Sequence, residues 1–305
     1  MLFALFFGAS EYKIHIMVTN FFLPEFYGNF KMIIFLHDLM ESHPEYFYED
    51  IRIAAAYGCF PGNIWNGGRV IIGSASKEDI DFAIKEYNDR GIAIRFTFTN
   101  PRLETIHLLD TYCNLCMREA HNGKNEVLVN SPLLEKFLKD NYPDYKYISS
   151  TTKCLGSAKM LRKELEKDYY LVVLDSAMNN TDELFALDHR DRMELIVDHF
   201  CQDNCPRRKT HYNILGKSQM EFSTPPADFT CKNIDREFFQ IMENRSFIST
   251  DLIFGKYKDA GFRHFKLDGR SYLPHRLIAS FLYYLVKPEW HNQMWQVILR
   301  EVYKL

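Results

Sequence analysis

The sequence predicts an α/β protein built as a single TIM-type (β/α)8 barrel. Short apolar runs alternate along the chain with amphipathic helical stretches, and eight such runs can be counted. Most of the runs are continuously apolar, which suits parallel strands buried on both faces. Eight βα units in 305 residues match one barrel of this class. A doubly wound open sheet is the alternative, because counting strands does not show that the sheet closes.

The expected strands end at polar or turn-forming residues. They are Ile14–Thr19, Arg69–Gly73, Ile92–Phe98, Glu126–Val129, Tyr145–Ser149, Tyr169–Leu174, Leu195–Val197 and Phe262–Leu267. The chain between Glu41 and Trp65 is expected to be irregular. Functional side chains of such barrels gather at the C-terminal ends of the strands. The polar residues at those ends are Asn20, Ser74, Asn100, Asn130, Ser150, Asp175, Asp198–Cys201 and Asp268–Arg270. Any one of these could equally be a helix cap.

Helices are expected between the strands. Ser76 is a suitable N-cap for Lys77–Asp89, and Pro132 suits the first turn of a helix that ends at Asn141. Other helices are expected at Phe30–Glu41, Glu104–Ala120, Ser157–Lys167, Asp182–Leu187, Thr250–Asp259, Pro274–Val286 and Glu289–Val302. We therefore expect one domain over residues 1–305. It has a long cysteine-bearing excursion at about 199–249, after the seventh strand, and C-terminal helices within 274–305.

Composition limits the possible partners and the compartment. The net charge of −3 gives no overall attraction to nucleic acid, so an RNA contact would need a local basic patch, for which Arg207, Arg208 and Lys209 are the candidates. Seven irregularly spaced cysteines do not suit a disulfide scaffold and favour the reducing cytoplasm. No apolar stretch is long enough for a membrane span, and the apolar start Met1–Phe7 is too short for one.

Cysteines after the seventh expected strand could bind a metal. Cys201 and Cys205 are close in sequence, and Cys231 lies downstream. Thiolates are soft, charged donors that suit zinc and iron–sulfur clusters. His211 is a candidate fourth ligand, with His199 and Cys154 as other options. The alternative is that these cysteines are free and that the neighbouring basic residues form a solvated loop.

Polar residues at the end of the eighth expected strand could form a catalytic site. Alternation along the strand places Lys266 and Asp268 on one side, which in a barrel is the lumen. Asp268 and Arg270 could pair with each other or present their charges to a substrate. His199 could transfer protons, since imidazole titrates near neutral pH. G-x-S-x-G, H-E-x-x-H, Walker A and G-x-G-x-x-G motifs do not occur in the sequence, which argues against common hydrolases and nucleotide-binding proteins.

Two stretches resemble the peptidase U32 family. Ile248–Arg270 (ISTDLIFGKYKDAGFRHFKLDGR) is similar to a family block with a Ser-x-Asp-Leu helix, a glycine turn and a Lys-Ile-Glu-Gly-Arg strand end. Glu194–Cys201 is similar to the family strand that ends in His-Gly-x-x-Cys, and Cys205-Pro206-Arg207 to its Cys-Arg element. The resemblance is clearest over Met193–Tyr284. It implies a TIM-type barrel, and it implies that Cys201 and Cys205 are ligands of an iron–sulfur cluster.

Three functions follow from the sequence and the resemblance. The first is hydroxylation or redox modification of an RNA or a small biosynthetic substrate, supported by an iron–sulfur cluster on Cys201, Cys205 and Cys231. The second is peptidase activity, as the family name implies. The third is a non-catalytic barrel with a structural zinc site that adds His211 to the three cysteines. A radical-SAM enzyme is less consistent with the spacing, because Arg208 stands where its third cysteine is expected.

Overall fold

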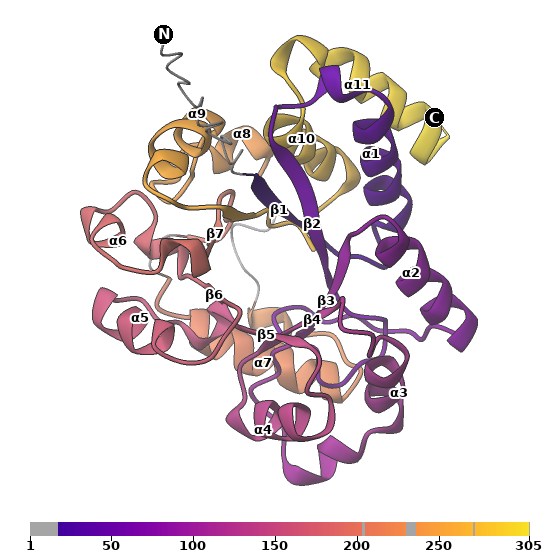
Figure 1. Ribbon diagram of the computed structural model, residues 1–305. Coiled ribbons are helices and arrows are strands. Elements are labelled where there is room, and N and C mark those ends of the chain that lie inside the picture. The colour runs from indigo at the N-terminus through magenta and orange to yellow at the C-terminus, as the bar shows by residue number, and fades with distance from the viewer. Residues whose placement is uncertain (1–17, 203–204, 230–235, 271, 305) are drawn as a thin grey trace, which may run out of the picture.

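The protein is a closed barrel of eight parallel strands. The computed structural model describes residues 18–202, 205–229, 236–270 and 272–304. Each strand pairs with the next along the chain, and the last pairs with the first (Figure 1). The strands are β1 (Thr19–Pro24), β2 (Ile51–Gly58), β3 (Ala93–Phe98), β4 (Glu126–Val129), β5 (Lys146–Ser149), β6 (Leu171–Val173), β7 (Met193–Ile196) and β8 (His264–Lys266). The predicted TIM-type barrel is confirmed.

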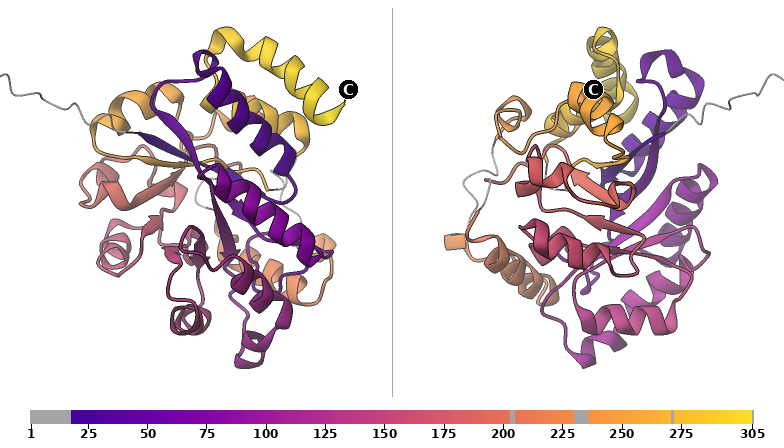
Figure 2. Two further views of the ribbon diagram at one scale, coloured as in Figure 1. Left: turned by 45° about the vertical axis from the view of Figure 1, so that its right-hand side comes forward. Right: turned by 60° about the vertical axis from the view of Figure 1, so that its left-hand side comes forward.

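Helices surround the barrel, as two further views show (Figure 2). Between the strands these are α1 (Phe30–Ser42), α2 (Lys77–Asp89), α3 (Thr111–Glu119), α4 (Pro132–Asn141), α5 (Ala158–Leu165) and α6 (Asp182–Phe185). After β7 come α7 (Arg208–Met220), α8 (Phe238–Ile241) and α9 (Thr250–Leu252), and after β8 come α10 (Pro274–Leu285) and α11 (His291–Ile298). No helix in the described part of the chain is long and apolar enough to cross a membrane.

Local sequence signals set several helix ends. The hydroxyl of Ser76 accepts a hydrogen bond from the backbone N–H of Asp79 at 3.0 Å, and the Asp79 carboxylate accepts one from the Ser76 backbone. This capping box starts α2 at the predicted residue. Pro132 is the first residue of α4, where its missing N–H costs nothing.

Two predicted strands were wrong. The first strand is Thr19–Pro24, so Asn20 lies near its beginning, where it contacts Arg52 and His264 at the end of the barrel away from the C-terminal strand ends. Residues 14–17 of the predicted strand lie outside the described residues. The second strand is Ile51–Gly58, in a region expected to be irregular, whereas Arg69–Gly73 forms a loop. The sequence did not indicate β2 because the strand contains three alanines, and alanine has low β propensity.

The barrel lumen holds an apolar layer and a buried charge network. Arg95 is fully buried, and its guanidinium contacts the carboxylates of Glu126 (Nε–Oε2 2.6 Å) and Glu194. The ammonium of Lys266 lies 3.6 Å from the other Glu194 oxygen. Two cations thus balance two carboxylates, which offsets the cost of burying each charge. Glu194 is the second residue of β7, and its side chain is fully buried in the barrel interior.

Candidate functional site

A small pocket opens at the C-terminal ends of the strands. Its volume is about 60 Å³. Three predicted catalytic residues line it, His199 after β7 and Asp268 and Arg270 after β8, together with Lys266 at the end of β8. Arg69 contributes from the loop after β2. Polar residues from separate loops therefore meet at the end of the barrel where TIM-barrel enzymes place their active sites.

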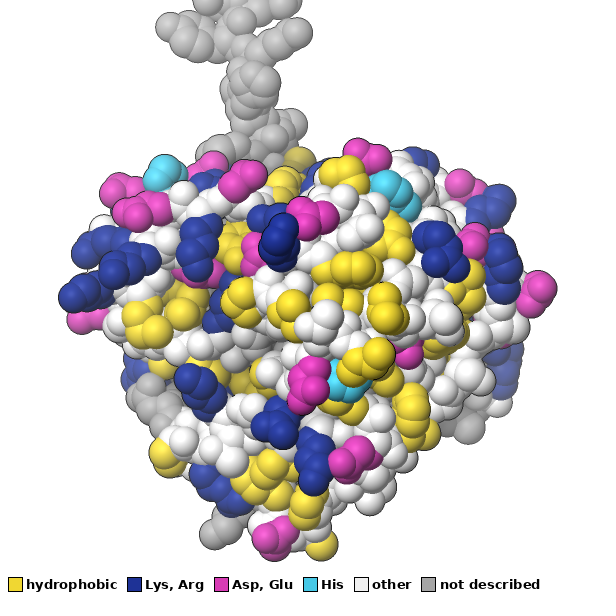
Figure 3. All heavy atoms as spheres, turned by 90° about the horizontal axis from the view of Figure 1, so that it is seen from below, with side chains coloured by type: hydrophobic (Ala, Val, Ile, Leu, Met, Phe, Trp, Pro, Cys, Tyr) yellow, Lys and Arg dark blue, Asp and Glu magenta, His cyan; other side chains and the backbone are white. Residues whose placement is uncertain are grey.

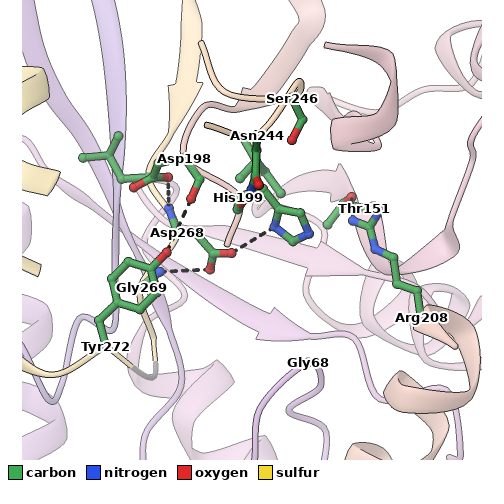
Figure 4. Close-up of polar contacts among 12 residues, drawn as sticks. Gly68, Thr151, Asp198, His199, Arg208, Asn244, Ser246, Asp268, Gly269 and Tyr272 are labelled. Carbon is green, nitrogen blue, oxygen red and sulfur yellow. Dashed lines mark hydrogen bonds and ion pairs between the residues drawn. The ribbon is translucent and has the colours of Figure 1, made fainter. Parts of the chain in front are cut away.

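His199 and Asp268 form a hydrogen-bonded pair. The Nδ1 atom of His199 lies 3.0 Å from Oδ2 of Asp268, as Figure 4 shows. Burial alone would raise the pKa of Asp268, but the hydrogen bond from His199 and the charge of Arg69 outweigh it and hold that pKa well below its usual range. A charged Asp268 requires the proton on Nδ1, which leaves Nε2 of a neutral ring as an acceptor. That nitrogen is buried and has no hydrogen-bond partner among the described residues.

Asp198 fixes the position of the backbone that carries Asp268. Its Oδ1 accepts the backbone N–H of Asp268 at 2.6 Å, and its Oδ2 accepts the hydroxyl of Ser280 on α10 at 2.6 Å. Burial, followed by the negative charge of Asp268, raises the pKa of Asp198 to about 7. The side chain therefore joins the ends of β7 and β8 to α10 and fixes the backbone that carries Asp268.

A glycine loop after β2 brings Arg69 to the pocket. Gly67 packs closely against Thr99: a Cβ atom added to Gly67 would lie 2.5 Å from the backbone of Thr99. Gly68 has a φ of +76°, which disfavours other residues, and Arg270 packs against it. Arg270 donates to the carbonyl of Gly67 at 2.8 Å and to the hydroxyl of Thr97 at 3.0 Å. Arg270 thus holds the loop in place, while Asp268 pairs with His199.

Positive charge predominates around the pocket. Arg69 lies 3.9 Å from Asp268 and 5.0 Å above the ring of Phe200. Arg208, on α7, donates to Asp175 at 2.6 Å and to the hydroxyl of Thr151 at 3.3 Å. Figure 4 shows Thr151 and Arg208 on the side of His199 that is away from Asp268. The free nitrogen of His199 therefore faces the side of the pocket where Thr151 lies, and the cations that line this pocket are Arg69, Lys266 and Arg270.

Helix α7 packs over part of this end of the barrel. The side chain of Gln219 donates to the carbonyl of Ile71 at 3.1 Å and accepts its N–H at 2.7 Å. Asn100, after β3, donates to the carbonyl of Gly216 at 3.0 Å, and a Cβ atom on Gly216 would lie 2.4 Å from the Asn100 oxygen. The segment predicted as a strand, Arg69–Gly73, is therefore held as a loop by a helix that the sequence did not predict.

Glu25 is a buried carboxylate that interacts electrostatically with Arg270 and Arg69 of the pocket, and the sequence reasoning missed it. It follows β1, and one carboxylate oxygen is buried without a hydrogen-bond partner in the described part of the chain. Burial raises its pKa to about 7, against the charges of Arg270 and Arg69. The signal was a carboxylate after an apolar run, and it was overlooked because the first strand was predicted to end at Thr19.

The predicted metal site stays a prediction, because one of its ligands lies outside the described residues. Cys201 and Cys205 are both partly exposed in the segment between β7 and α7, and Cys231 lies outside the described residues. Burial, with the charges of Arg69 and Arg207, lowers the pKa of His211 to about 4. Cations beside His211 disfavour a bound cation. No group of three or more His, Cys, Asp or Glu side chains in the described ranges could hold a metal ion.

The predicted basic patch is divided in the structure. Arg207 and Lys209 are exposed, and Arg207 stacks on the ring of Phe229 at 4.2 Å, whereas Arg208 points inward to Asp175. On the face of the molecule in Figure 3, basic side chains are interspersed with acidic and apolar ones. The structure therefore places Arg208 in an ion pair beside Thr151, which lines the pocket, rather than on an exposed basic surface.

Comparisons with known proteins bear on the fold. No protein-family model matches the sequence, and no curated protein matches it. Among solved structures, the U32 peptidase Mk0906 matches with a TM-score of 0.50 and 14% sequence identity, over 88% of this chain and 97% of that chain. At this identity the likeness concerns the fold. The chain therefore has the fold of a U32 peptidase, as the sequence resemblance implied.

Proposed function

We propose that the protein is a divergent U32-like barrel enzyme that binds a small anionic substrate at the pocket and uses His199 to transfer a proton. One observation carries the proposal. The His199 ring is oriented by Asp268 through Nδ1, and its buried Nε2 is left without a partner among the described residues. A buried polar atom without a partner is costly, and at an active site this cost is offset when substrate binds.

The pair acts by general acid–base catalysis. Nε2 of neutral His199 accepts a proton from the substrate or from water, and the carboxylate of Asp268 stabilises the imidazolium that forms. Asp268 keeps the ring in one tautomer because its two oxygens accept from His199 Nδ1 and from the N–H of Gly269. Positioned proton transfer of this kind contributes about 10²- to 10⁴-fold to rate.

Anion binding is the first test. Sulfate, phosphate and pyruvate are titrated into the protein in a calorimeter. We expect Arg69→Met to weaken binding at least about tenfold, because a charge-assisted hydrogen bond contributes about 1.5–3 kcal/mol. The matched control is Arg300→Met, which removes an exposed guanidinium that pairs with Glu301. Equal binding by Arg69→Met and the wild type would contradict the proposal.

Reactivity of His199 is the second test. Diethyl pyrocarbonate acylates unprotonated imidazole nitrogens, and peptide mass spectrometry locates the product. His199 should react more slowly than exposed His43 because its Nε2 is buried, and bound anion should slow it further while His43 reacts at an unchanged rate. If an anion concentration that saturates binding leaves the reaction rate of His199 unchanged, the histidine does not lie at the anion site.

Peptide hydrolysis is the second candidate. The matched structure is described as a peptidase, and an aspartate-oriented histidine with one free nitrogen can activate water. Labelled casein is a suitable substrate, with His199→Gln as the comparison. Release of peptides by the wild type but not by His199→Gln would favour this candidate.

The iron–sulfur hypothesis stays a proposal of its own. It concerns hydroxylation or redox modification of RNA or a small substrate in the cytoplasm, with Cys201, Cys205 and Cys231 as ligands. Anaerobic purification followed by iron, sulfide and zinc analysis tests it. Stoichiometric iron that is lost in Cys201→Ser would support the cluster, and zinc lost in the same variant would support the structural zinc site.

A further inference from the structure

We propose that Lys266 forms an imine with an oxo acid bound in the pocket. This inference rests on the proposed function to the extent that both use the same pocket. It adds a covalent step and narrows the substrate to a carboxylate with a neighbouring carbonyl group. Lysine amines form imines with carbonyl compounds in enzymes when burial makes the neutral amine accessible.

The position of Lys266 fits this role. It is the last residue of β8, its side chain is 8% exposed, and it lines the pocket together with Arg69 and Arg270. The aromatic ring of Tyr57 covers the amine at 3.8 Å. The nearest carboxylate oxygen, on Glu194, is 3.6 Å away and has no hydrogen-bond partner among the described residues. The amine therefore lies at the pocket without a short ion pair, and the contact with the Tyr57 ring favours its charged form.

Lys153 is a useful comparison within the same chain. Its side chain is also mostly buried, at 13% exposed, but its amine donates to Glu164 at 2.6 Å and to the hydroxyl of Tyr169 at 2.9 Å. Two short hydrogen bonds favour the ammonium form, which is not nucleophilic. Burial lowers the pKa of Lys153 as well, but these two hydrogen bonds already occupy its amine, and only Lys266 lines the pocket at the barrel mouth.

Several charged groups face the amine of Lys266. Burial lowers its pKa to about 8, against the charge of Glu194 and with that of Arg95. Arg270 adds to the lowering, and Asp268 opposes it. A fraction of the amine is therefore neutral at pH 7, whereas an ordinary lysine is almost wholly protonated.

The step balances without a further reagent. The neutral amine attacks the carbonyl carbon, and the C=O bond is replaced by a C=N bond. The two protons that the amine loses leave with the carbonyl oxygen as one water molecule. Protonation of the imine nitrogen restores a cation beside Glu194, so the charge balance of the lumen is kept. The substrate carboxylate remains free to meet Arg69.

Borohydride trapping tests the inference. The full-length protein is incubated with pyruvate and sodium borohydride, and the reduced adduct is located by peptide mass spectrometry. We expect one adduct, on Lys266, with a yield that rises with pH around a midpoint of about 8, as the amine loses its proton. Lys266→Arg keeps the charge beside Glu194 and should lose the adduct, whereas Lys153→Arg should label like the wild type.

The outcomes separate this inference from the proposed function. An adduct absent from Lys266, or spread over exposed lysines and unchanged in Lys266→Arg, would overturn the imine. If pyruvate still binds in the calorimeter in that case, the anion site stands and only the covalent step is wrong. If pyruvate does not label and none of the three anions binds, both proposals fail.

Discussion

The buried carboxyl of Asp198 should make the stability of the protein fall as pH rises, and Asp198→Asn should remove this effect. The side chain is fully buried, and its pKa is raised from 3.8 to about 7. Asparagine is isosteric and neutral at every pH. It can still accept the N–H of Asp268 through its oxygen and donate to the Ser280 hydroxyl through its amide, so the packing is preserved.

The size of the effect follows from the shift in pKa. The folded protein holds the proton of Asp198 up to about pH 7, whereas the unfolded chain releases it near pH 3.8. Between these values the folded state binds more protons, so the free energy of unfolding decreases as pH increases. Each pKa unit corresponds to about 1.4 kcal/mol, which gives a loss of about 2–3 kcal/mol between about pH 5 and about pH 8.

Urea denaturation over a pH series measures this directly. We expect the difference in unfolding free energy between Asp198→Asn and the wild type to grow by that amount across the range. Asp228→Asn removes an exposed carboxylate and should run parallel to the wild type. A constant difference between Asp198→Asn and the wild type would show that Asp198 is charged at neutral pH in the folded protein, and the reasoning would fail.

Three further substitutions probe other parts of the structure. Arg95→Met leaves two lumen carboxylates without their main cation and should cost about 3–5 kcal/mol in urea denaturation; a loss below about 1 kcal/mol would show that the network is dispensable. Gly68→Ala introduces a Cβ atom 2.7 Å from Arg270 at a φ of +76° and should cost about 1 kcal/mol or more and weaken anion binding; calorimetry showing unchanged affinity would dissociate this loop from the site. Ser76→Ala removes the N-cap of α2 and should lower the unfolding free energy by about 1 kcal/mol with anion affinity unchanged; a change in affinity would argue against a purely local role.

Much of the barrel could be predicted because its signals are local. Ser76 and Pro132 mark helix starts through hydrogen bonds and backbone geometry within a few residues. Strand β2 could not be predicted in this way. Its Ala55 and Ala56 carry little β preference and are buried by contacts made across the whole barrel. Conversely, Arg69–Gly73 has strand-like residues, but hydrogen bonds from Gln219, far along the chain, hold it as a loop.

The site residues likewise fall into those that local sequence signals indicate and those that only the folded chain brings together. Asp268, Arg270 and His199 could be named because they follow strands that the sequence located, and the structure places all three at one pocket. The pairing of Asp268 with His199 rather than Arg270 depends on how two strand ends are aligned, which the sequence does not state. Glu25 was lost with the misplaced first strand. The cysteine ligands stay a prediction, because Cys231 lies outside the described residues.

The pocket combines residues from the strand ends with a residue from helix α7, and this has a consequence for how such a site can evolve. The residues placed on strand ends, His199 and Asp268, depend on the barrel, whereas Tyr212 reaches the same pocket from α7, in the long segment between β7 and β8. An insertion can change in length and sequence while the strands beneath it persist. Related barrels could therefore keep one chemistry and acquire new substrates by exchanging this helix alone.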